Sequence, residues 1–297
     1  MHWARISLQC PRRLSELVAD LLSVAAGVPA AVEAAPSADT VSVYVPAERA
    51  DRSQAAVQAA IADLGPLLAA DGAPAVEVAL VDEEDWAEGW KQHFTPLRVG
   101  ERLVIKPTWA PWPPAEAPAA ARPDDVVIEL DPGMAFGTGT HPTTRLCLEA
   151  LEGALGRGDL VVDVGCGSGI LSIAAARLGA ARVLAVDHDP LAVRVCRDNV
   201  LANAVQGVVQ VVVGDRLSCL RLEPDLVVAN ILLQPVLALA GEAAQALRPG
   251  GRYLCSGVID TDEPVLTAGI QEMGLQPAGT RSAEGWLCQT WRRTPDA

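Results

Sequence analysis

The chain lacks the features that mark secreted and membrane proteins. Its 297 residues contain no apolar run long enough to span a bilayer and no signal peptide. The seven cysteines are scattered and form no C-x-x-C pair, which is unlike a disulfide framework or a zinc site and typical of reduced thiols. We therefore expect a cytoplasmic protein without a membrane partner, and no motif calls for a metal.

Basic residues are also scarce. The chain has 23 Lys and Arg against 37 Asp and Glu, which gives a formal net charge of -14. Residues 1–80 carry no basic stripe interleaved with aromatic side chains, so direct binding of nucleic acid is disfavoured and a protein partner is favoured. Hydrophobic residues make up 50% of the chain, enough for a large core and indicative of two domains.

A glycine-rich loop joins an expected strand to an expected helix in the C-terminal half. Val161 to Val164 is a short β-branched run, and Ile170 to Leu178 has helical spacing without proline. Glycines between them, from Gly165 to Gly169, permit positive φ and close approach of a ligand, and the helix N-terminus offers free N–H groups. The loop is typical of a cofactor site.

The surrounding acids indicate which cofactor. Asp187 follows the next expected strand, residues 182–186, where an acid accepts both hydroxyls of an adenosine ribose. The order G-x-G-x-G differs from the G-x-G-x-x-G of dinucleotide folds. Asp163 would repel a pyrophosphate but suits a ligand that bears an ammonium and a sulfonium. These features favour S-adenosylmethionine over a nicotinamide dinucleotide, and the plainer alternative is a tight turn without a ligand.

Strands and helices alternate through the rest of this half. Further strands are expected at residues 208–213, 225–229, 252–258 and 285–292, and helices at 190–203, 238–247 and 263–273. The alternation predicts an α/β fold with a mostly parallel sheet covered by helices on both faces. Ligands of such sheets bind beyond the carboxyl ends of the strands, and there the pattern places Gly165, Asp187, Asp215 and Asn230.

The N-terminal part is expected to be a separate domain. Its pattern predicts strands at 3–8, 31–35, 40–45 and 76–81, with helices at 14–25 and 53–64. The order βαββαβ indicates a small ferredoxin-like domain over 1–81, a linker over 82–95 and a second domain over 96–297. Within the second domain, Pro107 to Pro123 is rich in Pro and Ala and is expected to form a solvent-exposed loop.

Several blocks together resemble the bacterial ribosomal protein L11 methyltransferase (PrmA) family. Four blocks lie in the second domain: Leu130 to Thr144, Leu146 to Leu151, Gly165 to Leu171, and Val228 to Leu232. Short motifs in the linker also match: Glu84-Asp85-Trp86, Trp90-Lys91-Gln92 and Phe94. The blocks cover most of residues 82–260. The resemblance implies a Rossmann-like, seven-stranded class I methyltransferase domain, preceded by a small α+β ferredoxin-like domain that docks the protein substrate.

The resemblance also implies site residues and a reaction. Cofactor contacts carry over to Thr144, Gly165, Asp187 and Asn230, with Phe136, Thr140, His141, Gly167 and Asp215 as secondary contacts. The loop from Phe136 to His141 would fold over the cofactor, and Asn230 would orient the amine. The implied reaction is direct in-line methylation of lysine side chains and the N-terminal amine of free ribosomal protein L11 by a monomer.

Each of these residues also has a plainer interpretation. Thr144 could cap or pack the following helix, Asp215 could be a solvated turn acid, and His141 could bond backbone rather than act as a base. Cys166 is expected to pack. Related amino-group methyltransferases have Pro-Pro-aromatic after the Asn, whereas Ile-Leu-Leu follows Asn230 here, which disfavours a flipped nucleobase or a glutamine amide and leaves an aliphatic amine.

Two other functions remain open. One is a lysine methyltransferase of the same architecture that acts on a non-ribosomal protein, since the motifs describe the cofactor side only. The other is a cofactor-binding assembly factor that holds the ribosomal protein without modifying it. A less favoured alternative for the N-terminal domain is a purely structural appendage.

Overall fold

The computed structural model describes residues 3–28, 30–33, 35, 38–62, 76–81, 95–115, 117, 120–131, 137, 139–215, 217 and 223–294. The chain divides into two compact units. One contains Met1–Thr95 with Asp131–Phe136, and the other contains Pro96–Leu130 with Gly137–Ala297. The expected domain limits, 1–81 and 96–297 with a linker over 82–95, remain a prediction, because residues 82–94 lie outside the described part.

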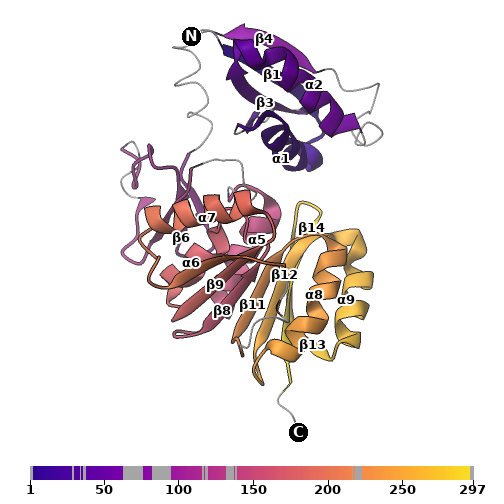
Figure 1. Ribbon diagram of the computed structural model, residues 1–297. Helices are drawn as coiled ribbons and strands as arrows, with labels where there is room; N and C mark the ends of the chain where they lie inside the picture. The colour runs from indigo at the N-terminus through magenta and orange to yellow at the C-terminus, as the bar shows by residue number, and fades with distance from the viewer. Residues whose placement is uncertain are drawn as a thin grey trace. The chain divides into compact units, whose positions relative to one another are not determined.

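The first unit is an antiparallel sheet packed against two helices (Figure 1). Its elements are β1 (Trp3–Cys10), η1 (Arg12–Leu14), α1 (Ser15–Ala26), β2 (Ala30–Glu33), β3 (Asp39–Pro46), η2 (Ala47–Arg49), α2 (Ala50–Ile61) and β4 (Glu77–Val81). The strand order is β2-β3-β1-β4, with β1 antiparallel to both of its neighbours. Alternate residues of β1, such as Ile6 and Leu8, are buried against Val18 and Leu22 of α1. The predicted ferredoxin-like arrangement is confirmed.

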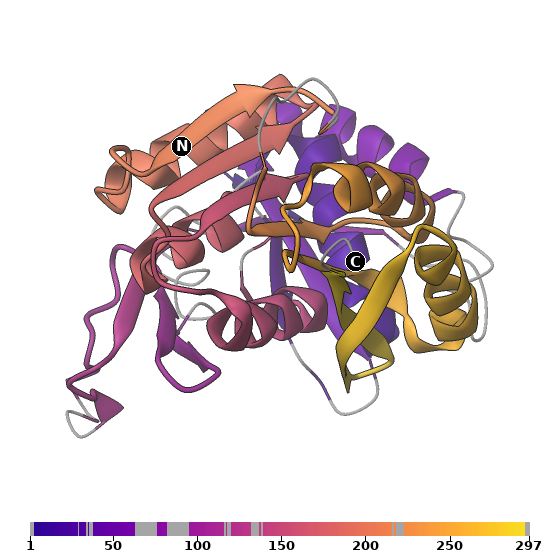
Figure 2. The same cartoon turned by 90° about the horizontal axis from the view of Figure 1, so that it is seen from below.

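The second unit contains a seven-stranded sheet with the order β10-β9-β8-β11-β12-β14-β13. The strands are β8 (Leu160–Val164), β9 (Arg182–Asp187), β10 (Val209–Val213), β11 (Leu226–Asn230), β12 (Arg252–Ile259), β13 (Leu275–Ala283) and β14 (Trp286–Arg293). The strands from β10 to β12 are parallel, whereas β14 is antiparallel to β12 and to β13. Figure 2 shows the β13–β14 hairpin at one edge. The predicted seven-stranded, mostly parallel sheet is confirmed.

Helices cover both faces of this sheet (Figures 1 and 2). They are α5 (Pro142–Ala154), α6 (Ile170–Leu178), α7 (Pro190–Ala202), α8 (Leu233–Ala246) and α9 (Glu263–Glu272), with the short η6 (Asp260–Asp262) before α9. Neighbouring residues of β8 belong to different cores: Val161 packs with α5, α6 and α7, and Val162 packs with α8 and α9. This period of two explains why β8 is apolar throughout except for Asp163.

A small sheet precedes the main one and holds the Pro/Ala-rich segment. It consists of β5 (Leu97–Val99), β6 (Leu103–Lys106) and β7 (Val126–Glu129). The segment from Pro107 to Pro123 is partly exposed, as expected, but it is also anchored. The carboxylate of Asp125 accepts hydrogen bonds from Arg98 at 2.7 and 3.0 Å and from Trp112 Nε1 at 3.0 Å. The Arg98 guanidinium holds the pKa of Asp125 well below its usual range.

Two features of the second unit differ from the prediction. Strand β13 was not predicted, because only Leu275 of its nine residues is buried and it contains Pro277 and Gly279 at a bulge. Helix α8 begins at Leu233 rather than at residue 238, because Pro235 lies in its first turn, where no intrahelical N–H bond is lost. No helix in the described part is long and apolar enough to cross a membrane.

Candidate cofactor and methyl-transfer site

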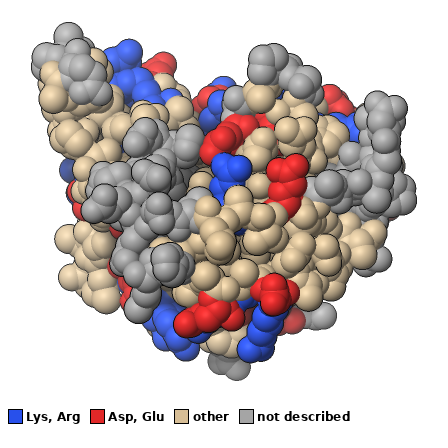
Figure 3. Space-filling model, turned by 90° about the horizontal axis from the view of Figure 1, so that it is seen from above, with Lys and Arg blue, Asp and Glu red and all other residues tan. Residues whose placement is uncertain are grey.

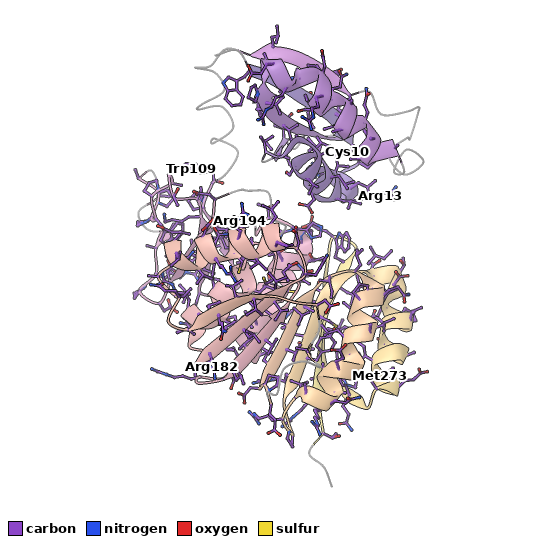
Figure 4. All side chains as sticks on the ribbon, in the orientation of Figure 1. Cys10, Arg13, Trp109, Arg182, Arg194 and Met273 are labelled. Atoms are coloured by element: carbon purple, nitrogen blue, oxygen red, sulfur yellow. The ribbon has the colours of Figure 1, made fainter. Side chains whose placement is uncertain are left out.

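The predicted site residues lie at the carboxyl edge of the parallel strands. Gly165 follows the last residue of β8, Asp187 ends β9, Asp215 lies two residues after β10, and Asn230 ends β11. The parallel registers bring these ends to one edge of the sheet. In Figure 4, Arg182, the first residue of β9, marks the opposite edge.

The glycine loop has a backbone that only glycine can adopt at two positions. Gly165 has φ +73° and a Cβ there would lie 2.5 Å from Ile231 Cγ2, while Gly169 has φ +83° and a Cβ there would lie 2.5 Å from Cys196 Sγ. The backbone N–H groups of Gly165 and Cys166 both donate to Val186 O, at 2.8 and 3.1 Å. The loop is thereby fixed beside β9. Buried Cys166 packs there, as expected.

Asp187 is held in place by backbone donors. Its Oδ2 accepts from Gly167 N at 2.9 Å, and its Oδ1 accepts from Asp189 N at 3.0 Å. The residue is only 7% exposed. A carboxylate oxygen can accept two hydrogen bonds, so each oxygen retains a lone pair for a ligand hydroxyl.

Asp163 is a buried carboxyl with one oxygen unused. Its Oδ2 accepts from Ser172 Oγ at 2.6 Å, and its Oδ1 has no hydrogen-bond partner within the described residues. Burial raises the pKa of Asp163 to about 7, the hydrogen bond from Ser172 lowers it, and the charge of Asp187 adds to the rise. An unsatisfied buried carboxyl is costly, and a positively charged group beside it would lower that cost.

Asn230 and Thr144 lie together although they are 86 residues apart in sequence. Asn230 Nδ2 donates to Thr144 Oγ1 at 3.4 Å, and Thr144 is fully buried on α5. Asn230 Oδ1 is buried without a hydrogen-bond partner in the part of the chain that the structure describes. Asn230 therefore offers an acceptor that none of the described residues uses.

The chain after Asn230 is held by a close backbone contact. Gly257 has φ +88°, and a Cβ on it would lie 2.1 Å from Ile231 O. Ile231 N also donates to Ser256 O at 3.1 Å. Glycine at position 257 therefore allows the β11–α8 connection to pass directly over β12. The sequence analysis did not identify Gly257, since a lone glycine inside a strand signals only a bulge or a close approach.

His141 caps helix α5. Its Nδ1 accepts from Thr143 N at 3.2 Å and lies 2.6 Å from Thr143 Oγ1, and its ring meets Trp286 edge-on with centroids 5.0 Å apart. Burial, followed by the charge of Arg145, lowers the pKa of His141 to about 4. The geometry favours the backbone-bonding interpretation over a general base. Thr144 is not the helix cap, because His141 holds that position.

The described part of the predicted cofactor loop is tied to the glycine loop. Ser168 Oγ donates to Gly137 O at 2.7 Å, and a Cβ on Gly139 would lie 2.7 Å from Ile105 Cδ1. Thr140 is exposed, as is Asp215, while Phe136 lies outside the described residues. Ser168 and Ser172 were not selected from the sequence, because a serine beside glycines carries no specific signal.

These residues fit S-adenosylmethionine. The glycine loop is held tightly at the end of β8, and Asp187 beside it offers acceptors for a ribose. Asp163 Oδ1 and Asn230 Oδ1, which have no hydrogen-bond partner among the described residues, suit a ligand that carries positive charge or an amine. The chain itself provides these hydrogen-bonding groups.

Comparisons with known proteins point in the same direction. A family model described as ribosomal protein L11 methyltransferase (PrmA) matches residues 2–294. The chain is 41% identical over 304 residues to a ribosomal protein L11 methyltransferase of Geobacter sulfurreducens, with 98% of each chain covered. It is 42% identical over 298 residues to one of Pelotomaculum thermopropionicum, which covers 93% of this chain and 94% of that protein.

A solved structure shares the fold. The crystal structure of a ribosomal protein L11 methylase from Lactobacillus delbrueckii subsp. bulgaricus superposes with a TM-score of 0.59 at 30% sequence identity. The match covers 68% of this chain and 100% of that one.

Proposed function

The chain belongs to the ribosomal protein L11 methyltransferase family, and on that basis we propose that it transfers methyl groups from S-adenosylmethionine to amines of ribosomal protein L11. The observation that carries the proposal is the family match over residues 2–294. The contact between Asn230 and Thr144 at the carboxyl edge of the sheet supports it, since it leaves one fixed acceptor for a substrate amine.

The cofactor would be held by residues at the ends of two strands, β8 and β9, and by helix α5. Asp187 would accept the ribose hydroxyls, the Gly165 to Gly169 loop would lie against the ligand, and Asp163 would face its positive charge. S-adenosylmethionine supplies a methyl group activated by a sulfonium. Thr144 would line the same place from the first turn of α5.

The chain's task with the substrate is to present a neutral, oriented amine. A lysine amine has a pKa of about 10.4, so its deprotonation near pH 7 costs roughly 4–5 kcal/mol. Desolvation at the site and a nearby positive charge both favour the neutral amine. Asn230 Oδ1 would accept a hydrogen bond from this amine and align its lone pair.

The surroundings of Asn230 support an aliphatic amine as acceptor. Ile231 and Leu232 follow it, and Leu232 is 71% exposed, so the chain directly after Asn230 offers aliphatic side chains. Aliphatic side chains pack against the methylene stem of a lysine and do not stack on a planar base. We therefore propose lysine side chains, together with the N-terminal α-amine, as the methylated groups.

Further parts of the proposal concern partners and place of action. The ferredoxin-like unit would dock the substrate protein. The formal charge of -14 disfavours direct contact with nucleic acid. We propose that the protein acts as a monomer in the cytoplasm on free ribosomal protein L11.

The test is to incubate the purified protein with S-adenosylmethionine and free ribosomal protein L11, and to record intact mass and fragment masses. Added methyl groups on lysines or on the N-terminal amine, lost in Asn230→Ala, are the expected result. Cofactor binding by titration without methylation of ribosomal protein L11 would contradict the proposal. A search for methylation of other proteins would then separate the non-ribosomal alternative from a non-catalytic assembly factor.

A further inference from the structure

A pocket of about 370 Å³ lies between the first half of α5 and the end of β13. The α5 wall carries Arg145 and Glu149, and the other wall carries Arg281, Ser282 and Glu284. All of its lining residues belong to the methyltransferase unit. None of the five is among the residues assigned above to the cofactor or to the amine.

The pocket adjoins the methyl-transfer site. Arg145 follows Thr144 directly in the first half of α5. On the other wall, Glu284 lies in the turn that leads into β14, whose first residue, Trp286, packs on the ring of His141. A chain segment bound in the pocket would therefore lie beside the helix turn that also carries Thr144.

Two ion pairs cross the pocket in opposite directions. Arg145 of α5 pairs with Glu284 of the hairpin, and Arg281 of β13 pairs with Glu149 of α5 at 3.8 Å. Figure 3, which draws the face seen from above, shows acidic and basic side chains next to one another on that face. The four side chains of these pairs are between 34% and 55% exposed. Such exposed pairs contribute little stability, so a charged ligand can replace them at low cost.

The wall formed by β13 is an edge strand. Among the described strands β13 pairs with β14 alone, and its residues from Gln276 to Ser282 are all exposed. Its first half is protected against pairing by Pro277 and the bulge that follows. The second half, which lines the pocket, has no such protection, so an extended segment can pair with its backbone.

Building on the proposed function, we infer that this pocket docks an extended, basic segment of the protein substrate next to the amine being methylated. A lysine or arginine of that segment pairs with Glu149 and Glu284 and displaces their intramolecular partners. Within the pocket two arginines balance two glutamates, so the preference for a basic segment comes from the whole chain, whose formal charge of -14 attracts cations and repels an acidic segment, and from the amines that the substrate presents. The pocket thus contributes to substrate selection while the chemistry stays at Asn230.

The experiment measures steady-state methylation of ribosomal protein L11 by the full chain and by the double variant Glu149→Gln, Glu284→Gln. We expect KM for the protein to rise about tenfold and its salt dependence to weaken, with kcat and cofactor affinity unchanged. Glu272→Gln, which removes an exposed acid at the end of α9, is the matched control and should leave KM as it is. A neutral second variant, Ser282→Tyr, fills the pocket and should raise KM as well.

The outcomes separate this inference from the proposed function. If the unmodified chain does not methylate ribosomal protein L11 at all, the proposed function fails. If it does, and the double variant and Ser282→Tyr both keep the original KM, the docking pocket is refuted while the function stands. A lower KM in the double variant would also overturn the inference, because Arg145 and Arg281 would then be binding an acidic segment. A small amine such as N-acetyl-lysine methylamide should be turned over equally by all variants.

Discussion

Asn230 Nδ2 donates to Thr144 Oγ1 at 3.4 Å, so the end of β11 and the first turn of α5 are joined at the carboxyl edge of the sheet. This contact occupies the amide nitrogen of Asn230 and leaves its buried oxygen as an acceptor unused by the described residues. Helix α5, which precedes all strands of the seven-stranded sheet in sequence, therefore helps to orient the Asn230 amide.

Asn230→Ala should lower kcat for ribosomal protein L11 by about a hundredfold, because the amine loses its orienting acceptor. Cofactor affinity, measured by titration calorimetry, should change much less. Thr144→Val removes only the hydroxyl that orients Asn230, so it should cause a smaller loss of kcat. Full activity of Asn230→Ala would rule out a role for Asn230 in amine orientation.

Gly257→Ala should destabilise the fold by more than about 3 kcal/mol, because the new Cβ would overlap the backbone of Ile231. The matched control is Gly274→Ala, at a similar φ of +83° with nothing within 4 Å of the new Cβ. It should cost only the conformational strain, about 1 kcal/mol. Urea unfolding of both variants measures the difference, and equal losses would show that the close contact is unimportant.

Asp163 should make both stability and cofactor binding depend on pH. Its pKa is raised in the fold to about 7 from 3.8, so its contribution to stability is complete below pH 3.8 and is lost as pH rises through about 7. A cationic ligand favours the ionised form, so affinity for S-adenosylmethionine should increase through the same range. Asp163→Asn should flatten both profiles when melting temperature and calorimetric affinity are measured from pH 4 to 8. If melting temperature and cofactor affinity depend on pH as steeply in Asp163→Asn as in the unmodified chain, Asp163 is not the titrating group.

The stability that His141 contributes should depend on pH in the opposite sense to that of Asp163. Its pKa is lowered in the fold to about 4 from 6.5, so its contribution is complete above pH 6.5 and is lost as pH falls through about 4. His141→Asn keeps a capping side chain and should remove this loss, whereas His141→Ala should also lose about 1–2 kcal/mol from the cap and the contact with Trp286. Melting temperatures against pH test this. A kcat of His141→Asn reduced a thousandfold would instead identify His141 as a base.

The local pattern of the sequence was sufficient for most of the elements. Helix α6 has the limits predicted for it, Ile170–Leu178, because its apolar spacing is bounded by glycines at both ends. Strand β9 ends at Asp187 as expected, since a β-branched run stops at a polar residue. The exposed edge strand β13 could not be predicted, because it buries one residue and its pairing to β14 alone makes it a strand.

By itself, the sequence determined the fold class, the glycine loop, the strand ends that carry Gly165, Asp187 and Asn230, and the resemblance to a methyltransferase family. These depend on short-range periodicity and on motifs within a few residues. Only the tertiary structure decided that Thr144 holds Asn230, that Gly257 supports Ile231, and that Asp163 has a raised pKa. Each of these comes from a contact between segments far apart in the chain or from burial, and neither is encoded in local spacing.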